Sequence, residues 1–347
     1  LSDLGVNTLW LSPFNSTVAY HGYHIVDFLS VDPHFGSSET LESLIESAHE
    51  RGMRIIMDFV PNHVHLSHPF FQDALEYRVS PYRRWFYFDQ SNSYLAFLDI
   101  AELPKLNLGY PAAARHVTDA AIHWLDRGFD GLRLDHVIGP TKEFWMQFAK
   151  DIRARHSSAV LIGEVFLSGI RWKNLKTINI DNKWIVTLLQ RLGFDATPLA
   201  MRQFEGILDG VLDFRFQSLV KRFVAKPRWN RPEWLLQALL RKHYRSFRDD
   251  FYLPSFLDNH DMSRFLYEAG QDNERLKHAA RIQFAQNQPV VIYYGTEIGM
   301  TQLEATGPER PYSDLKARQM MIWDEASQDR GLLEFYRWLI RRRKVEA

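Results

Sequence analysis

Short apolar segments alternate along the chain with longer segments whose apolar residues recur every three or four positions. In residues 38–51, for example, the apolar side chains stand at helical spacing, and Gly52 follows as a residue typical of a helix end. Residues 54–59 (RIIMDF) come next and form an apolar run typical of a buried strand. This alternation predicts βαβ units around a parallel sheet, and therefore the α/β fold class.

The pattern repeats and gives seven predicted strands. We place them at 7–11, 54–59, 131–135, 160–165, 210–214, 252–257 and 289–294, and the main helices at 38–51, 111–127, 141–155, 216–223, 232–245, 274–286 and 330–343. Seven strand–helix units are one short of a closed (β/α)8 barrel of the TIM type. An open, doubly wound sheet is the alternative, but no glycine-rich phosphate loop follows the first strand, which favours the barrel.

We expect the missing strand to be the first of the barrel. Residues 1–5 look like the tail of a helix that ends at Gly5, so we expect a strand and most of its helix to precede Leu1. An incomplete barrel exposes unpaired strand edges, here at 7–11 and 289–294, and such edges attract another strand. We therefore expect either an upstream segment in the native protein or the association of two chains through the open side.

About fifty residues of aromatic-rich, irregular sequence separate the strand at 54–59 from the helix at 111–127. This stretch is longer than an ordinary connection between a strand and a helix. We predict that residues 62–108 form a small domain inserted after the third barrel strand, counting the missing one. The catalytic barrel then consists of residues 1–61 and 109–347.

Charge and composition narrow the classes of function. Lys and Arg number 42 and Asp and Glu number 42, so the net charge is zero, and we expect neither nucleic acid nor a membrane as a partner. No apolar run approaches the ~20 residues that span a bilayer. The chain has no cysteine, which excludes disulfides, thiol nucleophiles and cysteine-bound metals but leaves the cellular compartment open.

Polar residues gather where the predicted strands end, which is where barrel enzymes carry their chemistry. Four such groups stand out: Asp58, Asn62 and His63; Arg133, Asp135 and His136; Glu164; and Asp258, Asn259, His260 and Asp261. One acid after a strand is usually a helix cap, and one histidine is usually a satisfied polar group. Four groups that coincide with four strand ends favour a catalytic site.

The residue types suit glycoside hydrolysis with retention of configuration. Arg133 and Asp135 are two apart on one strand, so they share a face, and the guanidinium keeps Asp135 ionised as a nucleophile must be. Glu164 ends the next strand, where we expect the ~5–5.5 Å carboxyl separation of retaining enzymes and the role of general acid. Asp261 adds a carboxylate that can stabilise the transition state, and His63 and His260 can bind sugar hydroxyls.

Other interpretations remain open at this point. The Arg133–Asp135 pair can be a purely structural ion pair. His63 and His65 form an HxH sequence, which opens the zinc site of amidohydrolase-type barrels, and His136, His260 and Asp261 could complete it. Pro61 interrupts the strand before His63, which weakens that alternative. A non-catalytic binding or assembly protein is a third interpretation, although such proteins usually lack one of the catalytic acids.

These motifs resemble glycoside hydrolase family 13, the α-amylase family, over nearly the whole chain. The matching strings are DFVPNH at 58–63, GLRLDH at 131–136, GEV at 163–165, FLDNHD at 256–261, HGYHIVD at 21–27 and LPKLN at 103–107. Each string alone is weak, but their order and placement are specific. LPKLN is close to the version in neopullulanases and cyclomaltodextrinases. The stretch from His136 to Gly139 lacks the lysine that many α-amylases carry after the nucleophile.

The resemblance implies a barrel enzyme that cleaves α-glucosidic bonds in an α-glucan substrate, with no cofactor required for the chemistry. It implies Asp135 as nucleophile, Glu164 as proton donor and Asp261 as transition-state stabiliser. The residues that it assigns to substrate binding are Tyr23, His63, Arg133, His136 and His260. Asn62 matches a residue that binds a structural calcium ion in many family members, and Asp89, Asp99 and Glu102 are candidate oxygen donors. Within the family, the starch-type α-1,4 bond is our first expectation, followed by cyclomaltodextrins, pullulan and glucanotransfer.

Overall fold

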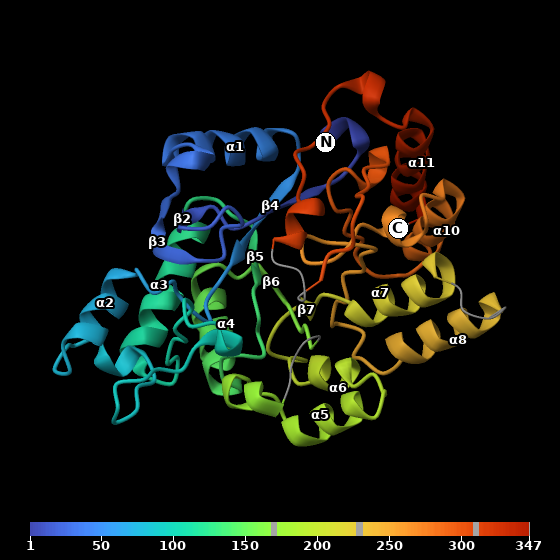
Figure 1. Cartoon of the computed structure of the whole chain (residues 1–347). Helices are drawn as coiled ribbons and strands as arrows, with labels where there is room; N and C mark the ends of the chain where they lie inside the picture. Colours follow the sequence, from blue (N-terminus) through green and yellow to red (C-terminus); the bar gives the residue numbers. More distant parts are fainter. Residues whose placement is uncertain (168–171, 227–231, 308–311, 347) are drawn as a thin grey trace. The chain divides into compact units, whose positions relative to one another are not determined.

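The computed structural model describes residues 1–167, 172–226, 232–307 and 312–346 (Figure 1). The chain divides into two compact units, which are treated separately below. One unit is Asn7–Val211, and the other combines Leu1–Val6 with Leu212–Ala347. None of the helices in the described residues is both long and apolar enough to cross a membrane.

The unit Asn7–Val211 is built around a parallel sheet with the strand order β1-β4-β5-β6-β7. Its strands are β1 (Thr8–Leu11), β2 (Asn15–Thr17), β3 (Ile25–Val31), β4 (Arg54–Phe59), β5 (Gly131–Leu134), β6 (Val160–Gly163) and β7 (Gly210–Val211). Its helices are η2 (Pro33–Phe35), α1 (Ser38–Glu50), α2 (Pro69–Glu76), η3 (Arg83–Trp85), η4 (Phe97–Asp99), α3 (Pro111–Asp126), α4 (Lys142–Arg155), η5 (Trp172–Thr177), α5 (Lys183–Arg191) and α6 (Thr197–Arg202). The predicted strand–helix alternation is confirmed here.

Helix α1 shows how the local sequence sets these boundaries. The Ser37 hydroxyl accepts a hydrogen bond from the N–H of Thr40 and so caps the first turn. The apolar residues that recur at helical spacing are buried: Leu41, Ile45 and Ala48. The chain leaves the helix at Arg51 and turns at Gly52, whose φ of +68° is a left-handed conformation that glycine adopts without strain. The helix predicted at 38–51 is confirmed.

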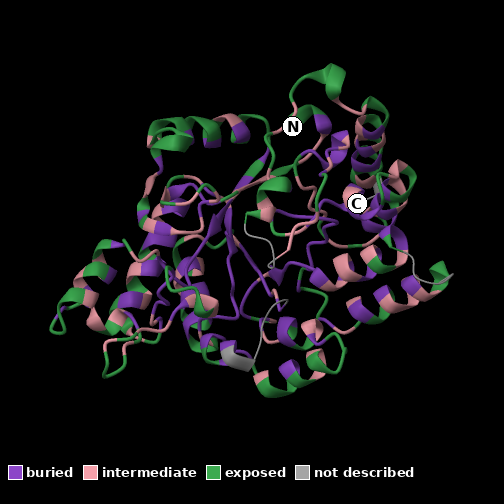
Figure 2. Ribbon diagram, viewed as in Figure 1, coloured by how far each residue is buried: buried purple, intermediate pink, exposed green. Residues whose placement is uncertain are grey.

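The strands of this sheet are largely buried, as their continuous apolar sequences predict (Figure 2). In β4 the buried side chains include Ile55, Met57 and Phe59. The Phe59 ring stacks on Phe148 of α4, with 6.4 Å between the ring centroids. The Trp145 indole N–H, also on α4, donates to the carbonyl of Val137 at 2.7 Å. These contacts fix the segments that follow β4 and β5, where the predicted site lies.

An antiparallel hairpin lies between β1 and α1, where the apolar pattern predicts only a loop. It consists of β2 and β3, and the pairing is interrupted by register shifts. The prediction missed β3 because its two buried residues, Ile25 and Phe28, are three apart and do not alternate as strand residues usually do. Before β3 the chain turns at Gly22, where a Cβ atom would lie 2.2 Å from the carbonyl oxygen of Pro13. This close approach fixes the position of Tyr23, the next residue.

The segment 62–108 contains α2, short helical turns and isolated antiparallel bridges. One bridge joins His63 to Lys105, and another joins Phe86 to Leu106. The N–H of Leu106 donates to the carbonyl of Asn62 at 3.0 Å, so the LPKLN motif lies against the residues that follow β4. Whether this segment is a domain of its own stays a prediction, because both its ends belong to the same compact unit.

The second unit is mainly helical. Its elements are η1 (Ser2–Leu4), α7 (Phe214–Val220), a π-helical turn η6 (Lys221–Ala225), α8 (Glu233–Tyr244), α9 (Phe265–Glu268), α10 (Asn273–Phe284), η7 (Thr296–Ile298), η8 (Ser313–Lys316), η9 (Glu325–Ser327) and α11 (Arg330–Glu346). Its core joins side chains from Leu4 and from α7 to α11, with Phe216, Leu276 and Tyr336 among the most buried. The helices predicted at 232–245, 274–286 and 330–343 are confirmed within a few residues.

The strands predicted at 252–257 and 289–294 are wrong as regular strands. In the described residues they meet in one parallel bridge, between Ser255 and Val290, with the N–H of Ser255 donating to Pro289 and the N–H of Val291 donating to Ser255. Pro254 and Pro289 have no N–H to extend this ladder. Each of the seven predicted strand segments still takes part in parallel pairing or in a parallel bridge.

Candidate active site

Three neighbouring strands of the unit Asn7–Val211 carry charged side chains to their carboxyl ends. β4 carries Asp58, β5 carries Arg133 and leads into Asp135, and β6 leads into Glu164. Asp58 and Arg133 are register partners, and Asp135 follows Arg133 by two residues. The three side chains therefore leave the sheet on one face. The N–H of Glu164 donates to the last carbonyl of β5 at 2.9 Å, which places Glu164 directly beside Asp135 in the sheet.

The Arg133 guanidinium contacts all three carboxylates. Nη1 donates to Oδ1 of Asp58 at 2.7 Å and to Oδ1 of Asp135 at 2.9 Å, and Nη2 forms an ion pair with Oε1 of Glu164. Burial acts to lower the pKa of Arg133, but the surrounding anions, chiefly Asp58 and Glu164, outweigh it and raise that pKa well above its usual value. Arg133 is therefore a permanent positive charge shared by three acids. The predicted Arg133–Asp135 contact is present.

Asp58 links this cluster to Tyr23 and Trp10. The Tyr23 hydroxyl donates to Oδ2 of Asp58 at 2.7 Å, and the Trp10 indole N–H donates to the same oxygen at 3.2 Å. The Trp10 ring also lies under the Arg133 guanidinium, 5.3 Å from ring centroid to Cζ. Asp58 is fully buried, and it positions both the arginine and the tyrosine. The sequence placed Asp58 at a strand end but gave no sign of this double role.

Two buried histidines lie on either side of a phenylalanine. The His63 ring stacks on Phe97, and the His136 ring meets Phe97 edge to face, each with 4.6 Å between centroids. Burial, followed by the nearby His24 and Lys105, lowers the pKa of His63 to about 3. Burial, followed by Lys105, also lowers the pKa of His136 well below its usual value. Both rings are neutral at pH 7, and a neutral imidazole can donate one hydrogen bond to a sugar hydroxyl.

His136 adopts a left-handed backbone conformation with φ of +45°, which is unusual for a residue other than glycine. Its backbone N–H points to Oε2 of Glu164 at 3.4 Å. The strained residue thus follows the predicted nucleophile directly and contacts the predicted proton donor. Backbone strain of this kind tends to concentrate at functional sites. Phe97, from the insertion, was not among the predicted site residues.

Asn62, the candidate calcium ligand, has a different partner. The Lys105 ammonium donates to Oδ1 of Asn62 at 2.6 Å and to the carbonyl of Gly139 at 2.8 Å. Gly139 comes so close that a Cβ atom there would lie 2.0 Å from Oδ1 of Asn62. A positive group already fills this space, so the residues at Asn62 do not fit a calcium ion.

Two of the other candidate calcium donors, Asp89 and Asp99, are also engaged elsewhere. Asp89 accepts hydrogen bonds from Ser91 and Ser93, and Asp99 pairs with Asn174 and Lys176.

The unit that contains residues 212–347 carries the other two predicted residues, His260 and Asp261. Nε2 of His260 lies 3.0 Å from Oδ2 of Asp261, and Nη2 of Arg318 lies 3.0 Å from Oδ1 of the same carboxylate. The Nε–H of Arg318 also donates to the carbonyl of His260 at 3.0 Å. Asp261 is thus held between two side chains. Arg318 was not predicted, and no pattern in the sequence marks it.

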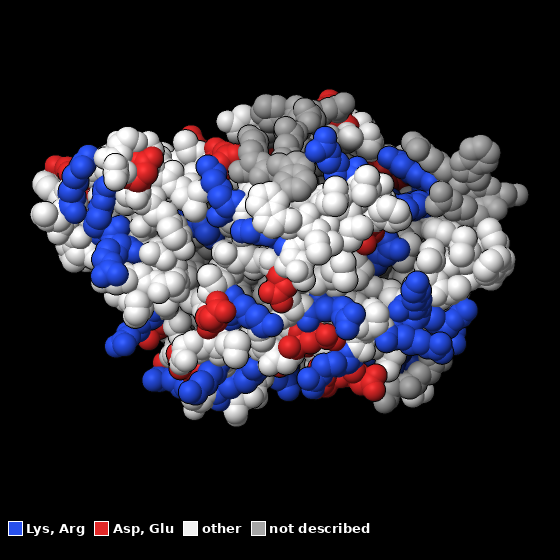
Figure 3. Space-filling view, turned by 90° about the horizontal axis from the view of Figure 1, so that it is seen from below, with Lys and Arg blue, Asp and Glu red and all other residues white. Residues whose placement is uncertain are grey.

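The structure brings together Tyr23, Arg133, Asp135, His136 and Glu164 in one unit, with His63 joined to them through Phe97. His65, the second histidine of the HxH sequence, lies instead against His24, with 5.6 Å between ring centroids. The two histidines of that sequence therefore have different partners. On the face seen in Figure 3, basic and acidic side chains are interspersed, in keeping with the zero net charge.

The whole chain is similar to proteins of known family. Residues 1–93 and 84–346 match the family model described as the α-amylase catalytic domain. The chain is 32% identical over 345 residues to α-amylase 2 of Dictyoglomus thermophilum, covering 99% of this chain and 56% of that protein. It is 29% identical to neopullulanase 2 of Thermoactinomyces vulgaris, covering 99% of this chain and 54% of that protein. The match favours the glycosidase interpretation over the zinc-dependent alternative.

Solved structures agree with this result. The structure superposes on the cyclic α-maltosyl-(1→6)-maltose hydrolase from Arthrobacter globiformis with a TM-score of 0.80 and 25% identity, covering 98% of this chain and 70% of that chain. A cyclomaltodextrinase gives a TM-score of 0.81 and 27% identity, covering 99% of this chain and 54% of that chain. The α/β barrel class predicted from the sequence is confirmed. The chain spans little more than half the length of the curated relatives named above.

Proposed function

Because this chain belongs to the α-amylase family, we propose that it is a retaining glycoside hydrolase that cleaves α-1,4-glucosidic bonds in starch, maltooligosaccharides or related α-glucans. The observation that carries the proposal is the contact of one buried guanidinium with Asp135 and Glu164 at the ends of adjacent strands. Retaining glycosidases need two carboxyl groups in this relation, one as nucleophile and one as acid and base.

In the first step, the Asp135 carboxylate attacks the anomeric carbon of the glucosyl unit. The bond between that carbon and the glycosidic oxygen breaks, and Glu164 gives its proton to the leaving oxygen. Arg133 keeps Asp135 ionised and oriented for this attack. The products are a glucosyl ester on Asp135 and a free sugar hydroxyl.

In the second step, Glu164 removes a proton from water, and the resulting oxygen attacks the same anomeric carbon. The ester bond breaks, Asp135 returns as a carboxylate, and Glu164 is protonated again. Two inversions at one carbon give net retention. A sugar hydroxyl in place of water gives transfer instead of hydrolysis, so the same residues also support glucanotransferase activity.

The remaining residues have binding and stabilising roles in this proposal. Tyr23 lies on Asp58 and offers a ring face for the sugar, and the neutral His63 and His136 can donate hydrogen bonds to its hydroxyls. Asp261, oriented by Arg318 and His260, stabilises positive charge that develops on the ring in the transition state. No metal is required for any of these steps.

A second candidate is the hydrolysis of cyclomaltodextrins or pullulan. The observation that favours it is the similarity to proteins named neopullulanase and cyclomaltodextrinase, together with the LPKLN motif at 103–107. A non-catalytic role is disfavoured because Asp135, Glu164 and Asp261 are all present.

Product analysis separates these candidates. The chain is incubated with maltoheptaose, pullulan or β-cyclodextrin, and products are followed by mass spectrometry and by NMR of the anomeric proton. We expect α-anomers as the first products, and a faster reaction on maltoheptaose than on the other two. First products of β configuration would contradict retention, and the absence of turnover on all three would contradict a glycosidase. The variant Glu164→Gln serves as the inactive control.

A further inference from the structure

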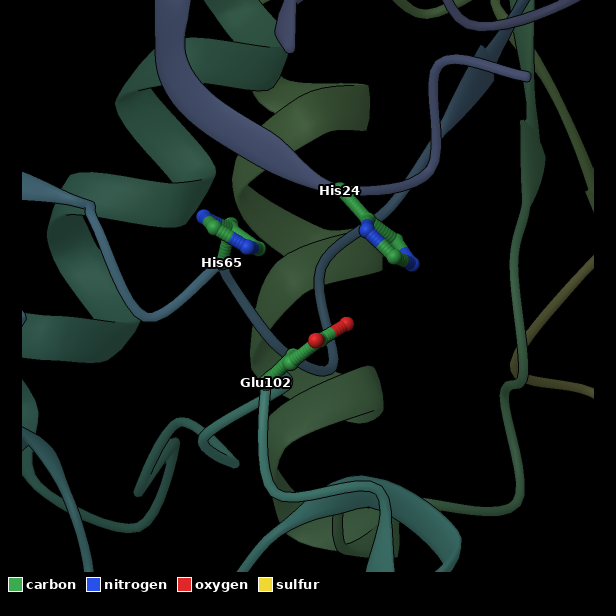
Figure 4. Close-up of side chains that lie close together, drawn as sticks. All are labelled: His24, His65 and Glu102. Carbon is green, nitrogen blue, oxygen red and sulfur yellow. The ribbon is translucent and has the colours of Figure 1, made fainter. Parts of the chain in front are cut away.

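A second group of potential ligands lies beside the candidate active site, in the unit Asn7–Val211 (Figure 4). It consists of His24 just before β3, and of His65 and Glu102, which lie near the two ends of the segment 62–108. One ligand atom of each residue lies within 4.8 Å of the other two. None of these three residues has a role in the proposed glycosidase mechanism.

The main chain holds the three ligands in place. The N–H of His65 donates to the carbonyl of Ile25 at 2.8 Å, which fixes His65 next to His24. The N–H of Leu66 donates to the carbonyl of Glu102 at 2.8 Å, which joins the two ends of the segment 62–108. Three segments far apart in the sequence are therefore joined by backbone hydrogen bonds at the positions that carry the ligands. This arrangement reduces the ordering that metal binding requires.

The two imidazoles are in the form that binds metals. Burial, followed by the charge of His65, lowers the pKa of His24, and burial lowers the pKa of His65. A lowered pKa favours the neutral imidazole, which is the form that binds metals. The rings stack at an interplanar angle of 13°, and Glu102 is exposed and can rotate toward them.

His65 also has a partner for its other nitrogen. The Ser67 hydroxyl lies 2.8 Å from Nδ1 of His65, and the Ser67 N–H lies 3.2 Å from the same atom. A metal on Nε2 moves the ring proton to Nδ1, where a hydrogen bond to the Ser67 hydroxyl replaces the donation from the Ser67 N–H. Histidine ligands commonly carry such a hydrogen bond on the nitrogen that does not bind the metal.

From this geometry we propose that His24, His65 and Glu102 form a binding site for Zn²⁺ or a similar divalent transition-metal ion, with water completing the coordination. Two imidazole nitrogens and one carboxylate are typical zinc ligands, whereas calcium takes six to eight oxygens. Tetrahedral zinc with bonds of ~2.0–2.1 Å needs ligand atoms about 3.3 Å apart. The ligand atoms are now up to 4.8 Å apart and must come closer together on binding. The exposed Glu102 side chain is the one that can move.

The site joins the segments that carry two of the proposed sugar-binding residues. His24 directly follows Tyr23, and His65 lies two residues after His63. A bound ion links the hairpin to both ends of the segment 62–108, and so restricts the movement of all three parts. The metal proposal does not depend on the glycosidase proposal, because binding and stability can be measured without substrate.

The test uses the chain freed of metal by a chelator and purified without a histidine tag. Zn²⁺ binding is measured by isothermal titration calorimetry, and Co²⁺ is used as a spectroscopic probe of coordination number and ligand type. We expect one strong equivalent of Zn²⁺, and an absorption spectrum typical of four-coordinate Co²⁺ with nitrogen ligands. The variants His65→Ala and Glu102→Gln should each weaken Zn²⁺ binding by ~10-fold or more.

Two controls keep the result interpretable. His34→Ala removes a histidine whose side chain is 92% exposed and pairs with Asp32, and it should bind Zn²⁺ like the wild type. Glu102→Gln changes an exposed residue and should fold normally, so its loss of binding cannot come from misfolding. Zn²⁺ should also raise the melting temperature of the wild type but not that of His65→Ala. Zn²⁺ affinity equal in all variants, or no binding at millimolar Zn²⁺, would overturn the proposal.

Discussion

The Lys105 side chain offers the sharpest test of the electrostatics around the site. Lys105 is 2% exposed, and its ammonium donates to Asn62 and Gly139, with no carboxylate among these acceptors. Burial lowers the pKa of Lys105 from 10.5 to about 7. The perturbation is Lys105→Met, which keeps the length of the side chain and removes the titrating amine.

The magnitude follows from that pKa. A difference of 3.5 between the folded and unfolded values corresponds to about 5 kcal/mol of preference for the neutral amine. Below pH 7 the amine is protonated in both the folded and the unfolded chain, so it adds no pH dependence to the free energy of unfolding. Between pH 7 and 10.5 the unfolded chain binds a proton that the folded chain does not, so stability rises with pH by up to ~1.4 kcal/mol per unit. Above pH 10.5 the amine is neutral in both the folded and the unfolded chain, so the free energy of unfolding no longer rises through this group.

A second contribution of Lys105 to the free energy of unfolding does not depend on pH. Removal of the amine leaves Oδ1 of Asn62 without its donor, at a cost of about 1–3 kcal/mol. The carbonyl of Gly139 keeps a hydrogen bond from Asn179, at 2.5 Å, and costs less. We therefore expect the free energy of unfolding to rise more steeply with pH in the wild type than in Lys105→Met. The wild type should gain about 2–3 kcal/mol over Lys105→Met between pH 7 and 9.

Urea unfolding followed by tryptophan fluorescence measures both free energies across this pH range. Lys183→Met is the matched control, because Lys183 also donates to two carbonyl oxygens, of Leu175 and Ile178, but is only half-buried. Activity on maltooligosaccharides is measured in parallel, since Lys105 supports Asn62, the neighbour of His63. The argument that burial lowers the pKa of Lys105 to about 7 predicts different pH dependences for the two proteins. It is refuted if the free energies of unfolding of the wild type and Lys105→Met change in parallel from pH 6 to 9.

The remaining predictions concern the acids. Asp135→Asn and Glu164→Gln should each lower kcat by about three orders of magnitude or more while the far-UV circular dichroism spectrum is unchanged, and near-full activity in either would show that the assignment is wrong. Asp261→Asn should lower kcat by ~10²–10³-fold, whereas a raised KM at constant kcat would indicate a ground-state binding role instead. Asp58→Asn should shift the basic limb of the pH–rate profile to lower pH, because the buried cluster loses one negative charge; an unmoved limb would exclude this coupling.

Periodicity explains why much of the fold could be predicted. Helix α1 was located from a cap and from apolar spacing, and both depend only on neighbours in the sequence. The common face of Arg133 and Asp135 follows from the two-residue repeat of a strand. The hairpin of β2 and β3 was missed because β2 has no apolar alternation and β3 buries residues three apart.

Contacts between distant residues were beyond these arguments. Arg318 lies 57 residues from Asp261, and Lys105 lies 43 residues from Asn62. The sequence marked Asn62 as a candidate calcium ligand, because the resemblance supplied that role. Only the folded chain shows that a lysine from the insertion donates to it. Partners of this kind depend on how the segments pack, and no local pattern contains that information.

The charges around Arg133 give a physical reason why one of the acids that contact it should keep a proton. One guanidinium contacts three carboxylates, of Asp58, Asp135 and Glu164, and all four side chains are buried. If every acid is ionised, these four groups carry a net charge of −2 in a poorly solvated site, and burial of unpaired charge is costly. A proton held within the cluster lowers this cost.

In the proposed mechanism, Glu164 is the residue that holds this proton. Asp58 accepts hydrogen bonds from Tyr23 and Trp10 in addition to Arg133. Asp135 shares Nη1 of Arg133 with Asp58, at 2.9 Å. Glu164 ends a different strand and contacts the other terminal nitrogen. The proposed mechanism needs a nucleophile that stays ionised beside an acid that keeps a proton, because this is the division of roles that retaining glycosidases require.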